Sequence, residues 1–149
     1  MRYNKRDYSI ELDTYEIWIQ ADKMYNQAEY GYILSQLNRK TEARTYYDKQ
    51  IYYCKENLRL KRVWAMEGVA DVALFGTYIY LSDHEMAIHH LKEYEKKFFG
   101  RTGPTYFQVA PQFKSIWGNE EFKAIMQRQE KKYADIRAEV DQLEKEGKL

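Results

Sequence analysis

Helix-breaking residues are scarce along this chain, and that scarcity constrains its fold more than any other feature. Glycine and proline number 7 and 2 among 149 residues, and most of them lie between residues 100 and 118. These two residue types mark most turns and loops. No segment shows the sustained period-two alternation of apolar and polar residues that half-buried strands have. The sequence therefore predicts an all-α fold, with long helices on either side of one irregular stretch.

Apolar spacing and capping residues divide the chain before residue 100 into four long helices. Asp13, with Glu16 three residues later, is expected to begin the first helix. The third is apolar nearly all round, which predicts a central helix packed on more than one side. The fourth is expected to begin with a capping box made of Ser82 and Glu85. The four expected helices cover residues 13–38, 41–60, 61–81 and 82–99.

The irregular stretch, residues 100–118, is predicted to be a loop that contains one short helix from Pro111 to Trp117. Proline is favoured in the first turn of a helix, which places Pro111 at its start. Asn119 is then expected to cap a last helix that extends to about residue 147.

The last helix carries apolar residues at alternating steps of four and three, the a and d spacing of a coiled coil. We expect the first half of this seam, from Phe122 to Tyr133, to pack against the rest of the chain. The second half is left as the candidate seam of a homodimer. Its residues are Ile136, Val140 and Leu143.

Composition excludes several classes of function. The chain has 24 Lys and Arg against 23 Asp and Glu, a net charge of +1, so nothing attracts it to nucleic acid or to an anionic membrane. No apolar run approaches the length of a membrane span, and the basic N-terminus lacks the apolar stretch of a signal peptide. Cys54 is the single cysteine and is expected in the core rather than in a disulfide. These features predict a cytoplasmic protein.

An internal repeat is visible when the tetratricopeptide pattern of two antiparallel helices is laid on the sequence. Its glycine, alanine and aromatic positions fall on Gly31, Ala43 and Tyr47. A second copy falls on Leu74, Tyr78, Ala87 and Leu91. We therefore expect a single domain, with one repeat over 13–60 and a second over 61–99. Because two repeats leave an apolar end exposed, residues 100–118 and the helix over 119–147 are expected to cap it.

A family resemblance is carried by the spacing Pro111-x-Phe113-x-x-Ile116-x-x-Asn119-x-x-Phe122. It resembles the P-x-F-x-x-L-x-x-D-P-x-F element at the end of many bacterial tetratricopeptide-type proteins, and the ending "LEKEGKL" is similar to theirs. Asn119 and Glu120 replace the usual Asp-Pro. In that family the region is commonly the C-terminal part of multidomain signalling proteins with cyclase, kinase or transcription-regulator domains. The resemblance implies a role in interaction or regulation and allows the chain to be a fragment of a longer protein.

A partner-binding groove follows from the resemblance, because the first helix of each tetratricopeptide repeat lines the concave face. An aromatic groove of this kind suits an extended peptide or a helix of a protein partner. The alternative is that the last helix of the chain fills the groove. The residues carried over are Tyr25, Tyr32 and Gln36 from the first repeat, with Val72 and Tyr80 from the second.

Catalytic and metal-binding patterns are weak. Glu85, His89 and Glu93 share one helix face and could hold a metal with His84, but a solvated charged face explains them as well. No serine-hydrolase, phosphate-loop or zinc-protease motif is present. We expect no catalytic residue, no metal and no cofactor. Two functions remain open: a non-enzymatic protein-interaction module, and a regulatory or sensor domain that binds a small ligand.

Overall fold

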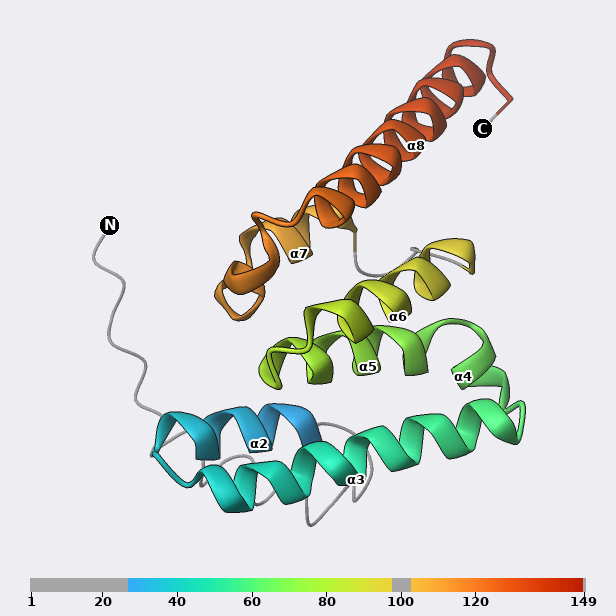
Figure 1. Cartoon of the computed structure of the whole chain (residues 1–149). Coiled ribbons are helices and arrows are strands. Elements are labelled where there is room, and N and C mark those ends of the chain that lie inside the picture. Colours follow the sequence, from blue (N-terminus) through green and yellow to red (C-terminus); the bar gives the residue numbers. More distant parts are fainter. Residues whose placement is uncertain (1–26, 98–102, 149) are drawn as a thin grey trace.

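The computed structural model describes residues 27–97 and 103–148, and every regular element in these ranges is a helix (Figure 1). The predicted all-α class is confirmed for this part of the chain. The expected start of the first helix at Asp13, and the groove residue Tyr25, lie outside the described residues. None of the described helices has the length and apolar character needed to cross a bilayer. The elements are α2 (Gln27–Gln36), α3 (Lys40–Arg59), α4 (Val63–Met66), α5 (Val69–Tyr80), α6 (His84–Lys96), α7 (Pro104–Val109), the 3-10 helix η1 (Pro111–Ile116) and α8 (Glu120–Lys145).

Two antiparallel helix hairpins form the body of the molecule (Figure 1). One pairs α2 with α3, and the other pairs α5 with α6. The central helix α5 also packs on α2 and α3, which joins the hairpins, and it contacts η1 on another side. This explains why the sequence of α5 is apolar nearly all round: little of its surface is left for water.

Three of these helices are followed by a residue whose backbone adopts the left-handed conformation. Asn38, Lys61 and Ser82 follow α2, α3 and α5 with φ of 63°, 51° and 59°. In each turn the next N–H group bonds back to a carbonyl inside the helix, as Asp83 N does to Tyr78 O at 2.9 Å, which is the Schellman arrangement. The expected capping box with Ser82 is therefore wrong. The side chain of the next residue, Asp83, caps α6 by accepting from Met86 N at 3.1 Å.

The third expected helix, 61–81, is broken into α4 and α5. Gly68 stands between them with φ of 103°, a conformation that glycine adopts without steric cost. A Cβ atom at Gly68 would lie 2.7 Å from the ring of Tyr94. The expectation of one continuous helix is wrong because glycine here both turns the chain and admits an aromatic ring.

Small residues let α2 and α3 approach closely, as the repeat pattern predicts. A Cβ atom on Gly31 would lie 2.7 Å from Tyr47 Cε1 and 3.0 Å from the carbonyl oxygen of Ala43. Ala43 and Tyr47 are buried, with 1% and 4% of their surface exposed. The glycine position of the pattern is thus needed for packing rather than for a turn.

The stretch 100–118 is less irregular than predicted. Where a loop was expected, α7 begins with Pro104 in its first turn, and the segment from Pro111 is a 3-10 helix that ends at Ile116 rather than an α-helix to Trp117. Both segments cover α5. Phe75 of α5 meets Phe107 edge to face at a centroid distance of 5.3 Å and stacks with Phe113 at 5.3 Å.

The last helix begins and packs as expected. The side chain of Asn119 accepts a hydrogen bond from Phe122 N at 3.0 Å, which confirms the predicted N-cap. Phe122, Met126 and Gln129 are buried, which confirms packing within the chain for the first half of the seam. Beyond Tyr133 the helix projects from the body (Figure 1). The candidate dimer residues there are Ile136 and Val140, 48% and 39% exposed, and the partly buried Leu143.

Candidate functional site

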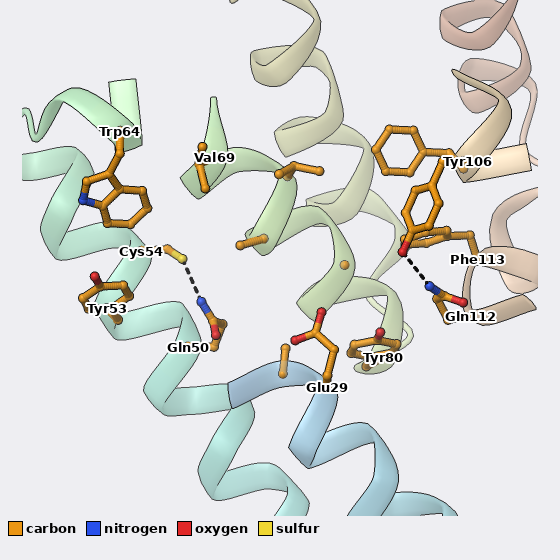
Figure 2. Close-up of a pocket in the computed structure, with 15 residues that line it drawn as sticks. Glu29, Gln50, Tyr53, Cys54, Trp64, Val69, Tyr80, Tyr106, Gln112 and Phe113 are labelled. Atoms are coloured by element: carbon orange, nitrogen blue, oxygen red, sulfur yellow. Dashed lines mark hydrogen bonds between the residues drawn. The ribbon is translucent and has the colours of Figure 1, made fainter. Parts of the chain in front are cut away.

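A pocket of about 200 Å³ lies where the two hairpins meet the C-terminal segment. Helices α2 and α3 form one side, α4 and α5 another, and α7 with η1 a third (Figure 2). Helix α8 contributes no residue to this lining. The lining residues are Ala28, Glu29, Gln50, Tyr53, Cys54, Trp64, Val69, Val72, Ala73, Gly76, Tyr80, Tyr106, Phe107, Gln112 and Phe113.

Aromatic rings make up much of the wall. The rings of Tyr53 and Trp64 stack at 5.5 Å with an interplanar angle of 20°. Across the pocket, the hydroxyl of Tyr106 accepts a hydrogen bond from Gln112 Nε2 at 2.9 Å, which fixes the position of that ring (Figure 2). Aromatic faces carry negative partial charge, so such a wall suits apolar groups and cations alike.

Glu29 alone carries a formal charge among the described residues that line the pocket. Its carboxylate points into the space beside Tyr80 (Figure 2). Burial raises the pKa of Glu29, and only its own backbone N–H opposes that shift. No Lys, Arg or His among the described residues forms an ion pair with it. Among the described residues, the carboxyl group of Glu29 therefore has no cation beside it that would stabilise its charged form.

Gln50 places a second polar group in the pocket. Its side chain is almost completely buried, with 4% exposed, and Nε2 donates to the sulfur of Cys54 at 3.1 Å. The amide oxygen Oε1 is buried with no hydrogen-bond partner. Burial of the thiol raises the pKa of Cys54 to about 11, so the thiol is neutral at physiological pH and unsuited to act as a nucleophile.

The pocket contains some of the predicted groove residues. Val72 and Tyr80 line it. Tyr32 does not, although its ring stacks on Tyr80 at 4.8 Å. Gln36 is exposed at the end of α2. The structure thus brings three of the four described groove residues together and leaves Gln36 apart.

The sequence analysis did not predict Glu29 and Gln50 as pocket residues, nor that α7 and η1 form one wall of the pocket. Glu29 was detectable in principle, as a carboxylate among apolar neighbours on the expected groove helix. Gln50 and Tyr106 gave no such signal, since their place in the pocket depends on how the hairpins and α7 come together.

A second polar cluster is buried between α5 and α6. One carboxylate oxygen of Asp71 lies 3.1 Å from His90 Nδ1, and the other is bound by Lys97 Nζ. Burial alone would raise the pKa of Asp71, but the bonds from His90 and Lys97 outweigh it and hold the pKa below its usual value. The imidazole of His90 stacks on Tyr78 at 5.6 Å. This cluster ties the two helices of the second hairpin together.

The histidine face of α6 shows no metal geometry. Glu85 and His89 are exposed, and Glu93 pairs with Lys96. Across residues 27–97 and 103–148, no group of three or more His, Cys, Asp or Glu side chains is placed to hold a metal ion.

Comparison with known proteins adds no relative: no family model, curated protein or solved structure matches this chain. The tetratricopeptide resemblance therefore stays a prediction, and the pocket itself is the basis for the proposed function.

Proposed function

We propose that this protein is a non-enzymatic protein-interaction module, a tetratricopeptide-like stack of helix pairs capped by α8, which takes a peptide or helix of a partner protein. The observation that carries the proposal is the aromatic pocket where the two hairpins meet α7 and η1. Peptide-recognition grooves commonly seat one or two anchor side chains in such pockets. The stack is supported by the close approach of Gly31 to Ala43 and Tyr47, the contact that the repeat pattern requires.

The second candidate is a regulatory or sensor domain of a bacterial cyclase or transcription-regulator system that binds a small ligand. It is favoured by the enclosure of the pocket by elements on three sides. It shares the site with the first candidate and differs in the ligand. A longer parent chain that carries a catalytic or DNA-binding domain would favour it.

Gly76 offers a test of the site. A Cβ atom there would meet nothing within 4 Å, and Gly76 lines the pocket within α5. We therefore expect Gly76→Leu to place a good helix former in the pocket without a clash at its Cβ atom. The matched control is Ala134→Leu, which adds the same side chain to the exposed distal part of α8.

The measurement is binding of wild type and both variants to an array of immobilised peptides of varied sequence. We expect wild type and Ala134→Leu to bind the same subset of peptides, and Gly76→Leu to lose it. Equal binding by all three proteins would remove the pocket from the proposal. Binding by none, together with a thermal shift from small molecules that Gly76→Leu abolishes, would favour the sensor domain instead.

A further inference from the structure

The polar groups of the pocket point to the chemistry of what binds there. Glu29 supplies a carboxylate with no described cationic partner, and Gln50 supplies an amide oxygen that is buried without a hydrogen bond. Both are acceptors. A buried acceptor without a partner is unfavourable, so a ligand that brings donors would stabilise Gln50, and a cationic ligand would also pair with the partly buried carboxylate of Glu29.

Glu29 and Gln50 line the same pocket. They come from adjacent helices, α2 and α3, and Figure 2 shows both side chains projecting toward the gap between α3 and α5. After the larger effect of burial, the negative charges of Asp71 and Glu29 raise the pKa of Cys54, and that of Glu29 raises the pKa of Tyr80. Because Cys54 and Tyr80 belong to different walls, the charge of Glu29 is felt across the pocket.

The aromatic lining favours the same kind of ligand. Tyr80 and Tyr106 present rings on the side opposite Trp64 (Figure 2). A cation is attracted to an aromatic face, most strongly where water is excluded. The alkyl stem of a basic side chain also packs well against such rings.

The size of the pocket limits the ligand to a single side chain. Sites for drug-sized molecules measure roughly 300–1,000 Å³, whereas this pocket measures about 200 Å³. Taking these observations together with the proposed function, on which this step rests, we infer that the pocket seats one lysine or arginine side chain of a partner peptide, its cationic nitrogen bound by Glu29 and Gln50.

The experiment compares short capped peptides that differ at one residue in a background of alanine. Lysine is matched with norleucine, and arginine with citrulline, so that each pair differs mainly in charge. Binding to the full chain is followed by NMR shifts of the pocket amides. We expect the cationic peptides to bind at least tenfold more tightly than their neutral partners.

Two variants of the protein test the assigned acceptors. Glu29→Gln keeps the shape of the side chain and removes its charge. It is expected to weaken binding of the lysine and arginine peptides at least tenfold and to leave binding of the neutral peptides unchanged. Gln50→Leu keeps the volume, removes the acceptor, and is expected to weaken the cationic peptides severalfold. The control is Glu85→Gln, which removes one exposed carboxylate from α6 and should change nothing.

The outcomes separate this inference from the proposed function. Equal binding of lysine and norleucine peptides, or unchanged binding by Glu29→Gln, would overturn the cation assignment but would leave the proposed peptide-binding function in place. Binding of butylamine as tight as that of the lysine peptide would overturn the assignment to a peptide side chain. Self-association of the wild type that Glu29→Gln abolishes would show that a second copy supplies the cation. If the wild type bound none of the peptides, that result would instead count against the proposed peptide-binding function.

Discussion

Two glycines inside helices give a sharp test of the packing, because the structure predicts opposite signs for the same substitution. Gly31 in α2 and Gly76 in α5 lie within helices, and neither has a positive φ. Replacing a glycine of this kind with alanine stabilises a helix by about 1 kcal/mol, since alanine loses less backbone freedom on folding. What differs between the two sites is the surroundings of the added methyl group.

At Gly31 the added carbon would lie 2.7 Å from a ring carbon of Tyr47 and 3.0 Å from the carbonyl oxygen of Ala43. The first distance is below any real contact, and the oxygen belongs to the backbone of α3, which cannot move alone. Overpacking of this kind costs about 1–3 kcal/mol. Set against the gain in helix propensity, the net loss is about 1 kcal/mol. At Gly76 no atom lies within 4 Å, so the gain of about 1 kcal/mol stands.

Urea unfolding followed by far-ultraviolet circular dichroism measures both free energies of unfolding. Gly31→Ala should unfold at lower urea than wild type and Gly76→Ala at higher urea, with a gap between the variants of about 2 kcal/mol. If Gly31→Ala were as stable as wild type, the close contact of α2 with α3 would be refuted. If Gly76→Ala were destabilised, the open space beside α5 would be refuted.

Four further predictions address other parts of the molecule. Asp71→Asn should destabilise the fold by about 2 kcal/mol near neutral pH, because it weakens charged hydrogen bonds in a buried cluster. Since the folded-state pKa of Asp71 is depressed, that contribution is present above its ordinary pKa of 3.8 and lost as the pH falls below it, so the stabilities of wild type and variant should converge in acid urea titrations. Lys61→Gly should raise the unfolding free energy by about 1 kcal/mol by relieving a left-handed φ, and an unchanged urea midpoint would contradict the turn. Cys54, fully buried with its pKa raised to about 11, should resist a thiol reagent in the native protein and react at once in urea; rapid native labelling would contradict its burial. If the distal seam of α8 pairs two copies, light scattering should find a dimer that Ile136→Asp converts to a monomer, and a monomeric wild type would end that idea.

The helices were predictable from the sequence because their signals are local. Periodic apolar residues mark a helix face wherever the helix packs, and Asn119 caps its own helix through an atom three residues away. The burial of Phe122 and Met126 followed from the same periodicity. Each of these signals needs only the neighbours along the chain.

The turns that separate the helices were harder to predict from the sequence, because the residues that form them do not stand out there. Gly68 and Gly76 occupy one apolar run, yet only Gly68 has a positive φ, and there the ring of Tyr94 also fills the space that a side chain would need. Lys61 and Ser82 adopt left-handed conformations that sequence reasoning assigns to glycine or asparagine. Both residues are exposed, and in each turn the following N–H group bonds back to a carbonyl of the preceding helix, so the turn forms without the residue type by which sequence patterns recognise it.

The site could be predicted only in part, and the reason lies in the C-terminal segment. Phe75 and Gly76 are consecutive on α5, but Phe107 and Phe113 cover the first while the second faces open space. The segment that completes the core of α5 therefore also forms one wall of the pocket, with the ring of Tyr106 on it. Stability and recognition are coupled at this wall: a change that loosens the Phe75 contacts also displaces the ring that faces the ligand. Partner specificity should therefore be sensitive to substitutions in α7 and η1 that never touch the partner.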